Sequence, residues 1–332
     1  MDMSLFFAGT GGSVPSARRG LPAVLVRRGG EWLLFDCGEG TQRQLLRSVG
    51  LADVECVFIT HFHADHWLGL PGMLKSFALR DREQPLSVYG PVGLKRLMEE
   101  TRFIYGRRLP YALTIVELAP AQALERDGYR VAAVPVNHGG GSAVGYVIVE
   151  DGRPGELDPA LAERLGVTPG PDFGRLVRGE TVNGVAPEQV VGPPREGRKV
   201  VISGDTAPCE ALAIAAHQAD VLVHEATFTE EEGERARQTS HSTARQAAEL
   251  AREAQARMLV LTHLSTRYAG REVREEARAV YPGAELARDF DTVEIPFPER
   301  GPAQLVRWSK RPNPGSDEQA DDANAVASSI MQ

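Results

Sequence analysis

The sequence predicts an α/β protein, a sandwich in which strands alternate with helices and the functional site lies along one sheet edge. Two observations indicate this class. Short apolar runs rich in β-branched residues recur along the chain, separated by helical patterns. Several of these runs end directly at a histidine or an aspartate, at residues 61, 138, 205 and 263. Because neighbouring strands end at the same edge of a sheet, these side chains predict one shared site.

Composition limits the kinds of partner. The 332 residues, 42% of them apolar, suffice for a substantial core. The net charge of −8 gives no overall attraction to nucleic acid or a membrane, so a polyanion must be held by local basic patches or metal ions. Cys37, Cys56 and Cys209 are odd in number and scattered, which indicates reduced thiols. Without a signal peptide pattern or a long apolar run, we expect a cytoplasmic protein that binds no membrane.

The N-terminal half reads as alternating strands and helices. Strands are predicted at residues 4–8, 23–26, 32–35, 54–59 and 86–89, and helices at residues 43–49, 71–80 and 93–100. The Gly-rich turn at residues 9–12 suggests phosphate binding, but it lacks the Lys-Ser/Thr of a P-loop and no helical pattern follows. A tight turn is the better interpretation.

The C-terminal half repeats the pattern around a long insertion. Strands are predicted at residues 129–136, 145–149, 199–203, 221–223 and 258–262, and helices at residues 210–218 and 242–256. From Asp151 to about Arg198 the pattern is irregular, with one short helical piece at 158–165, and such insertions are usually functional or flexible. We therefore expect one domain at 1–308 with an inserted arm at about 152–195, and a disordered tail at 309–332.

A loop at residues 60–66 carries the strongest chemical signal. It follows a predicted strand and places His61, His63, Asp65 and His66 within six residues, which uses three of the eight histidines in the chain. Imidazole nitrogens suit zinc and related ions, and a carboxylate among them lets one loop hold two ions. The alternative is a polar loop that is histidine-rich without binding metal.

Seven strand-end residues form the candidate metal site. Two zinc ions, with Mn²⁺ or Mg²⁺ as possible substitutes, could share a hydroxide that attacks a phosphodiester. His138 by itself could be a satisfied strand-end histidine, and Asp205 by itself could be a helix cap. The expected ligands are His61, His63 and His138 for one ion, Asp65, His66 and His263 for the other, and Asp205 as the bridge.

These residues carry a family resemblance. His61 to His66 resembles the His-x-His-x-Asp-His signature of the metallo-β-lactamase superfamily. The segments at 35–42, 224–227, 241–243 and 262–268, with Gly170-Pro171 in the insertion, are similar to the short form of ribonuclease Z. The resemblance covers about residues 4–297. It implies a four-layer αββα sandwich with a protruding flexible arm, and an endonuclease that removes the 3′ trailer from precursor tRNA and leaves a 3′-hydroxyl.

The resemblance also implies roles and a homodimer in which one subunit's arm presents tRNA to the other subunit's site. Asp65 is the expected proton acceptor, and His241, oriented by Glu225, the expected general acid. The alternatives are a helix charge for Glu225 and a cap for His241. Asp36 is expected to hydrogen-bond the metal loop, and His224 to support a ligand or pack. The expected tRNA contacts are Arg18, Arg19, Gly170, Pro171, Arg175 and Arg178, with Arg153 and Arg164 as further candidates.

The loop at residues 15–20 departs from the family pattern. The pattern reads Pro-x-Lys-x-Arg-Asn, and here Ala17 replaces the Lys and Gly20 the Asn, while Arg19 matches. Since this loop is linked to where cleavage falls relative to a CCA end, the sequence does not fix that position.

Two other functions fit parts of the sequence. One is a hydrolase of small phosphodiesters or aryl sulfates that uses the same ions, and loss of the arm would affect it little. The other is an RNA-binding module with a vestigial site, which metal analysis with an Asp205→Ala control would reveal.

Overall fold

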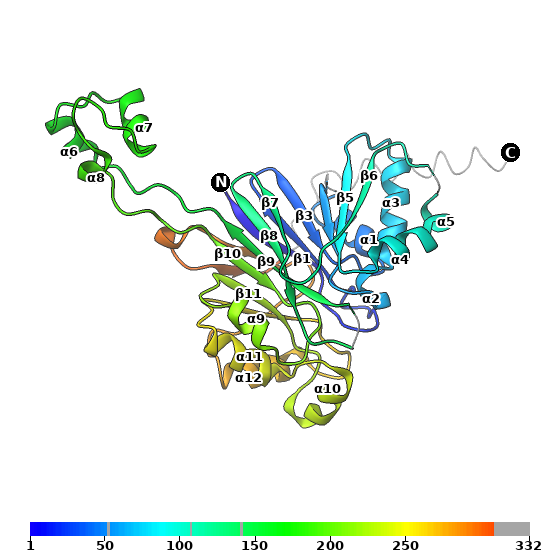
Figure 1. Cartoon of the computed structure of the whole chain (residues 1–332). Coiled ribbons are helices and arrows are strands. Elements are labelled where there is room, and N and C mark those ends of the chain that lie inside the picture. Colours follow the sequence, from blue (N-terminus) through cyan, green and yellow to red (C-terminus); the bar gives the residue numbers. More distant parts are fainter. Residues whose placement is uncertain (52–53, 107, 140–141, 309–332) are drawn as a thin grey trace, which may run out of the picture.

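Two β-sheets face each other, and helices cover their outer faces (Figure 1). The computed structural model describes residues 1–51, 54–106, 108–139 and 142–308. The predicted αββα sandwich is confirmed. The tail predicted at 309–332 lies outside the described residues.

The first sheet has eight strands and the second has seven. In sheet order, the first contains β15 (Gln304–Val306), β14 (Thr292–Glu294), β1 (Met3–Gly9), β2 (Ala23–Arg28), β3 (Glu31–Phe35), β4 (Cys56–Phe58), β5 (Leu86–Gly90) and β6 (Leu113–Glu117). The second contains β13 (Glu285–Leu286), β12 (Leu259–Thr262), β11 (Val221–Glu225), β10 (Lys199–Ile202), β9 (Val144–Glu150), β8 (Tyr129–Pro135) and β7 (Ala123–Arg126). Strands β10 to β13 run parallel, and buried parallel strands are typically apolar, as β10 after Lys199 and β12 before Thr262 are here.

Helices pack on both sheets. On the first sheet lie α1 (Thr41–Leu46), α3 (Gly69–Leu79), α4 (Leu94–Glu100) and α5 (Arg102–Tyr105). On the second lie α9 (Glu210–Ala215), α11 (Ala244–Glu253) and α12 (Gly270–Arg278). The short helices α2 (Ala64–Trp67) and α10 (Gly233–Thr239) and the 3₁₀ turns η1 (Glu230–Glu232) and η2 (Pro298–Arg300) lie in connections. Helix α11 begins at Thr243, whose side chain accepts a hydrogen bond from the Gln246 backbone N–H in a capping box.

The core between the sheets fixes the loop that follows β4. Phe35 and Phe58 stack with ring centroids 4.8 Å apart, and Tyr146 on β9 meets both rings edge-on from the other sheet. The Tyr146 hydroxyl donates a hydrogen bond of 2.7 Å to the carbonyl of Ile59. This bond joins the second sheet to the first residue after β4, two positions before the candidate ligand His61.

The insertion is more ordered than the sequence predicts. Instead of one helical piece it contains three short helices, α6 (Pro159–Arg164), α7 (Pro171–Val177) and α8 (Pro187–Val190). They enclose a small apolar cluster of their own, which includes Val167, Leu176 and Val182. Figure 1 shows these helices standing off from the body of the molecule at the end of two extended segments. The arm, residues 152–195, is thus a small folded unit.

The predicted strands agree with the structure. Each predicted strand appears within a few residues of its predicted bounds, whereas β6, β7, α12 and β13 to β15 were not predicted. The three cysteines are free, and Cys37 and Cys56 are buried. Among the described residues, no helix is both long and apolar enough to cross a membrane.

Candidate metal centre

The seven predicted ligands converge at one end of the sandwich. His61 and His63 lie on the loop after β4, and Asp65 and His66 lie in α2. The other three follow strands of the second sheet: His138 follows β8, Asp205 follows β10 and His263 follows β12. Chain segments far apart in the sequence therefore meet where these strands end.

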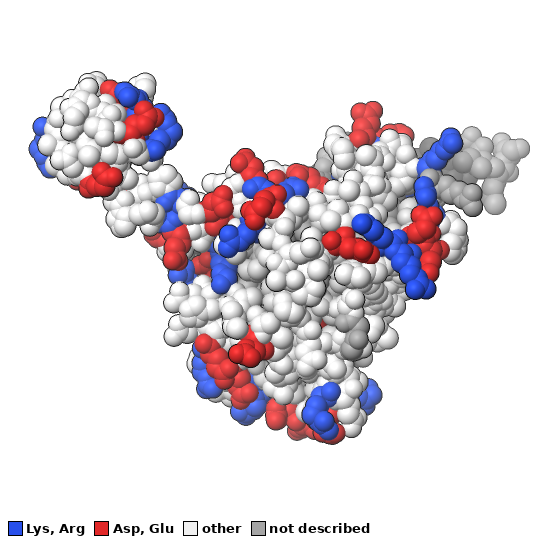
Figure 2. Space-filling view, in the orientation of Figure 1, with Lys and Arg blue, Asp and Glu red and all other residues white. Residues whose placement is uncertain are grey.

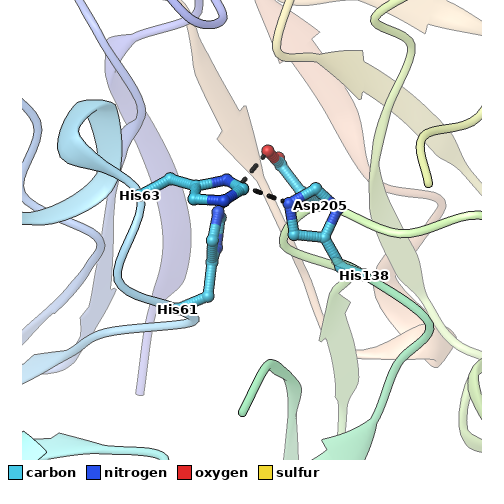
Figure 3. A group of neighbouring side chains, drawn as sticks. All are labelled: His61, His63, His138 and Asp205. Atoms are coloured by element: carbon cyan, nitrogen blue, oxygen red, sulfur yellow. Dashed lines mark hydrogen bonds and ion pairs between the residues drawn. The ribbon is translucent and has the colours of Figure 1, made fainter. Parts of the chain in front are cut away.

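The converging side chains form three overlapping groups. His61, His63, His138 and Asp205 form the first (Figure 3), Asp65, His66 and His263 form the second, and Asp205, His241 and His263 form the third. Asp205 Oδ2 lies 3.7 Å from His61 Nε2 and 3.3 Å from Nε2 of both His66 and His263. The Asp205 carboxylate thus lies between the histidines of the first group and those of the second, where a ligand to two ions would lie.

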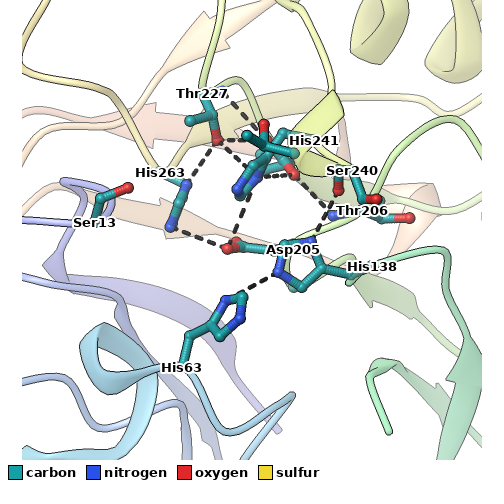
Figure 4. A network of polar contacts seen from close by, with 12 residues as sticks. Ser13, His63, His138, Asp205, Thr206, Thr227, Ser240, His241 and His263 are labelled. Carbon is teal, nitrogen blue, oxygen red and sulfur yellow. Dashed lines mark hydrogen bonds and ion pairs between the residues drawn. The ribbon is translucent and has the colours of Figure 1, made fainter. Parts of the chain in front are cut away.

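In three of the predicted ligand histidines, the ring nitrogen that faces away from the centre is held by a fixed partner. His66 Nδ1 donates to Asp36 at 2.8 Å, and His138 Nδ1 donates to the Ser240 carbonyl at 2.8 Å. His263 Nδ1 donates to the Thr227 hydroxyl at 2.8 Å (Figure 4). Such bonds fix the tautomer and leave the Nε2 lone pair free to bind a cation.

Inside the centre, buried polar side-chain atoms face one another without a hydrogen-bond donor and acceptor for each. The buried atoms His61 Nε2 and Asp205 Oδ1 have no hydrogen-bond partner among the described residues. His138 Nδ1 donates to the Ser240 carbonyl, so the lone pair of its Nε2 faces His63 Nδ1, 3.0 Å away. A buried polar atom without a partner costs free energy, and a cation would satisfy this set. The donor set therefore fits divalent metal ions, as predicted.

The protonation states of His61, His63 and Asp205 are consistent with the binding of a metal ion. Burial, reinforced by His66, lowers the pKa of His61 well below its ordinary value, and burial with His138 lowers the pKa of His63. Both imidazoles are neutral at neutral pH, which is the state that binds metal. Burial alone would raise the pKa of Asp205, but His263 and His66 hold it well below the usual range, so the carboxylate stays charged.

A second chain of contacts borders the centre. His241 Nδ1 donates to Glu225 Oε1 at 2.8 Å, and the Thr227 hydroxyl donates to Glu225 Oε2 at 2.5 Å. Burial would lower the pKa of His241, but the charge and hydrogen bond of Glu225 raise it to about 9. The rings of His241 and His138 are 4.8 Å apart, so His241 lies at the rim of the metal centre (Figure 4).

Known proteins share this sequence and fold. Residues 19–155 match the model of the metallo-beta-lactamase superfamily, and residues 176–264 match that of the beta-lactamase superfamily domain. Ribonuclease Z of Haloferax volcanii is 47% identical over 306 residues, 90% of this chain and 96% of that protein. Ribonuclease Z of Myxococcus xanthus is 47% identical over 303 residues, 89% of this chain and 98% of that protein. The chain belongs to the ribonuclease Z family.

Solved structures agree with this membership. Human tRNase Z, short form, aligns with a TM-score of 0.66 at 29% identity and covers 88% of this chain and 99% of its own. A diphosphatase of the PhnP family, at 21% identity and a TM-score of 0.60, shares the fold alone. The prediction of a phosphodiester hydrolase of the endoribonuclease class is confirmed by the ribonuclease Z relatives, and the clusters support a metal cofactor.

Three residues around the ligands had no predicted role or an open one. Thr227, inside the quoted family segment at 224–227, links His263 to Glu225. The Ser13 backbone N–H donates to Asp65 Oδ2 at 2.8 Å, so the Gly-rich turn holds a ligand. His224 is fully buried on the strand face opposite Glu225, and its Nδ1 donates to the Glu225 carbonyl at 2.8 Å, which favours the packing role.

The close approach of the His263 ring explains why the turn at residues 9–12 needs a glycine. His263 adopts a left-handed backbone with φ of 58°, and its ring lies against Gly12. A Cβ at Gly12 would lie 2.5 Å from His263 Nδ1, closer than real contacts allow. The turn thus serves the metal centre by close approach, in agreement with its interpretation as a tight turn.

The predicted tRNA contacts divide into exposed and engaged side chains. Arg18 is exposed, whereas the Arg19 guanidinium donates to the Thr10 hydroxyl at 2.6 Å and to the Ala287 carbonyl at 2.8 Å. Arg19 therefore braces the turn, and its role as a substrate contact stays a prediction. Gly170, with φ of 127°, immediately precedes α7, which Pro171 opens.

The arm is not a basic surface overall. Between residues 152 and 195 it has five arginines and six acidic residues. Arg175 pairs with Asp172 and Glu180, and Arg178 pairs with Glu180, whereas Arg164 is exposed without an ion pair among the described residues. On the face that Figure 2 shows, Arg side chains of the arm lie beside Asp and Glu side chains.

Proposed function

We propose that the chain is a zinc-dependent endoribonuclease that removes the 3′ trailer from precursor tRNA and leaves a tRNA 3′-hydroxyl. The observation that carries the proposal is the metal centre with its unpartnered ligand atoms, in a chain whose relatives are named ribonuclease Z. The arm supplies a second element that a small-substrate hydrolase does not need.

Two ions fit the ligand geometry best. His61, His63 and His138 would hold one, Asp65, His66 and His263 the other, and Asp205 both. Zinc ions held by these residues would supply a water of lowered pKa as the nucleophile and positive charge to stabilise the phosphate. The soft imidazole donors favour zinc, and Mn²⁺ or Mg²⁺ could substitute at lower affinity.

Asp65 is the proposed proton acceptor for the attacking water. The Ser13 N–H and His263 Nε2 both contact its Oδ2, at 2.8 Å and 3.2 Å. The hydrogen bond from the Ser13 N–H holds the carboxylate in one orientation. A fixed carboxylate can take up a proton without first reorganising.

His241 is the proposed general acid. Glu225 holds its Nδ1, so its Nε2 remains to donate a proton to the departing 3′ oxygen. The raised pKa of about 9 keeps the ring protonated at neutral pH. Glu225, itself fully buried, is a positioning residue for this step.

The strand directions support a homodimer. Strand β9 begins next to the metal loop, where the Val144 N–H donates to the Thr60 carbonyl at 2.9 Å, and it ends at Glu150, where the arm starts. Its seven residues span roughly 20 Å. The arm therefore leaves the end of the sandwich opposite the ligands (Figure 1). An RNA held on the arm is better placed for the site of a second subunit than for its own.

Deleting the arm tests the substrate. A variant in which a short Gly-Ser linker replaces residues 152–195 should lose cleavage of precursor tRNA but keep hydrolysis of bis(p-nitrophenyl) phosphate. If both activities persist unchanged, or if precursor tRNA is not cleaved by the intact protein, the small-diester alternative gains and the proposal fails.

Mixing two inactive variants tests the subunit arrangement. The arm-deleted protein has an intact centre, and an Asp205→Ala variant has an intact arm. If one subunit's arm serves the other's site, mixed dimers regain precursor cleavage that neither parent shows. Absence of recovery in a mixture that forms heterodimers would contradict presentation between subunits.

A further inference from the structure

The arm joins the body through a narrow two-stranded root. Arg153 and Arg195 exchange two backbone hydrogen bonds, of 2.7 Å and 2.8 Å. Gly155 approaches Gly192 so closely that a Cβ on Gly155 would lie 1.8 Å from the Gly192 carbonyl oxygen. An isolated ribbon of two strands is marginally stable in water, so its direction depends on what supports it.

The support comes from the C-terminal segment of the body. The guanidinium carbon of Arg153 lies 3.5 Å from the centroid of the Phe297 ring. Glu299 accepts hydrogen bonds from Arg153 Nη1 at 2.8 Å and Nη2 at 3.0 Å, and its Oε1 lies 3.6 Å from Arg195 Nη1. One aromatic ring and one carboxylate thus hold both strands of the root. We call Phe297 and Glu299 the root clamp.

The clamp itself rests on a rigid base. The Arg198 guanidinium lies 4.1 Å from the Phe297 ring centroid and is 1% exposed. It donates to both carboxylate oxygens of Glu150, at 2.6 Å and 2.8 Å, and to the Ile295 carbonyl at 2.9 Å. Hydrogen bonds from Arg153 lower the pKa of Glu299 to about 2, so the clamp is charged at any working pH.

We propose that Phe297 and Glu299 are positioning residues, which fix the direction in which the arm leaves the body and so place the bound precursor relative to the site. The proposal rests on the proposed function, because it presumes that the arm holds RNA. A bidentate Arg–carboxylate pair and a cation–π contact each constrain the orientation of the Arg153 guanidinium and its distance from the body. Together they restrict how far the root of the arm can bend. Since the clamp is at the end of the sandwich away from the ligands, it acts on the reaction only through the arm.

Kinetics of the full-length, metal-loaded protein test the effect on substrate. Phe297→Leu and Glu299→Gln should each raise KM for precursor tRNA about three- to tenfold, with kcat unchanged and bis(p-nitrophenyl) phosphate hydrolysis unchanged. Phe297→Tyr, which keeps the ring, should retain wild-type KM. Glu294→Gln is the matched control, because Glu294 is exposed in the same segment. Equal losses with both substrates, or an unchanged KM, would overturn the proposal.

Hydrogen exchange tests the clamp without RNA. Backbone amides at residues 151–157 and 191–198 should exchange faster in Phe297→Leu and Glu299→Gln than in the wild type or Glu294→Gln, while amides of β9 keep their rates. Unchanged exchange at the root would overturn the clamp. If the wild type leaves precursor tRNA intact, the proposed function fails, and faster root exchange in the two variants would still support the clamp.

Discussion

At the scale of single residues, the metal centre depends on side chains that the metal ions would not touch. Asp36, Thr227 and the Ser240 carbonyl each fix one ligand histidine, and each comes from a different part of the chain. The ligands were predictable because four of them lie within six residues and the others end apolar strands. Most of their partners were not, since Thr and backbone carbonyls carry no pattern that distinguishes them from ordinary turn residues.

Replacing His241 tests its role as a proton donor. His241→Ala should slow precursor tRNA cleavage by roughly 10²- to 10⁴-fold, because the 3′ oxygen then leaves without a proton. Hydrolysis of bis(p-nitrophenyl) phosphate should change little, since p-nitrophenolate leaves unaided. Single-turnover rates with both substrates make the comparison.

The matched control is His217→Ala, which removes an exposed histidine just after α9, on the outer side of the second sheet. It should leave both rates unchanged. An equal loss with both substrates in His241→Ala would assign His241 to the metal set instead, where Asp205 and His263 are its neighbours.

At the scale of elements, the patterns that predicted strands succeeded where a strand is buried on both faces. Strands β10 and β12 are apolar except at Lys199 and Thr262, and both were predicted. Strand β7, Ala123–Arg126, alternates between exposed and half-buried residues and has little β propensity of its own. It forms by pairing with β8 across the Asp127-Gly128 turn, a hairpin signal that a search for apolar runs passes over.

The arm was harder to predict for a related reason. Its apolar cluster is built from single residues spaced among Gly, Pro and charges, such as Val167, Val182 and Val185. Helices of four to seven residues give too few turns for a helical period to emerge. The folded unit exists because these separate residues meet in three dimensions.

Removing one acidic side chain tests whether the arm's arginines face RNA. Glu180 accepts from Arg175 Nε at 2.9 Å and lies 3.5 Å from Arg178 Nε. Such exposed pairs contribute little stability, so Glu180→Gln should leave the arm folded. It should release Arg178 from its carboxylate partner and leave Arg175 paired with Asp172 alone, so both guanidinium groups become more available to phosphates. We expect precursor tRNA to bind roughly two- to threefold more tightly, with a steeper salt dependence, in titrations at several salt concentrations.

Glu188→Gln provides the comparison, because Glu188 is also exposed on the arm but distant in sequence from these arginines. It should change affinity less than Glu180→Gln. Weaker binding in Glu180→Gln would mean that Glu180 orders the two arginines for their substrate instead of competing for them.

At the scale of the whole molecule, buried polar contacts join the sheets at both ends. Tyr146 bonds to Ile59 beside the metal centre. At the far end Glu150 accepts from both Arg28 and Arg198, and Arg198 reaches the Met1 carbonyl at 3.1 Å. The sequence predicted the sandwich and the site but not this far end, because a pairing among distant charged residues has no local pattern.

Acidic pH should weaken the hydrogen bonds that Glu150 accepts at the far end of the sandwich. Burial raises the pKa of Glu150, but hydrogen bonds from Arg198 and Arg28 outweigh it and lower the pKa below its ordinary value of 4.5. Because the folded pKa lies below the unfolded one, the stabilisation is complete above about pH 4.5 and is lost as the pH falls through the folded value. Glu150→Gln should reduce the free energy of unfolding at pH 7 by roughly 3–5 kcal/mol, since it leaves buried guanidinium groups unpaired.

Urea unfolding of both proteins between pH 7 and pH 3 measures this difference. The gap between wild type and Glu150→Gln should be constant down to about pH 4.5 and narrow below it. If the difference in unfolding free energy stays constant from pH 7 to pH 3, Glu150 stabilises the fold through its packing and not through its charge.

The central claim is that the metal centre cuts precursor tRNA at the 3′ trailer, and end-mapping of the products tests it most directly. Metal-loaded protein is incubated with precursor tRNA labelled at either end, with and without an encoded CCA. We predict one endonucleolytic cut that yields a tRNA with a 3′-hydroxyl and a trailer with a 5′-phosphate, and no cut after chelation or in Asp205→Ala. Intact precursor, or stepwise loss of single nucleotides from the 3′ end, would contradict the account.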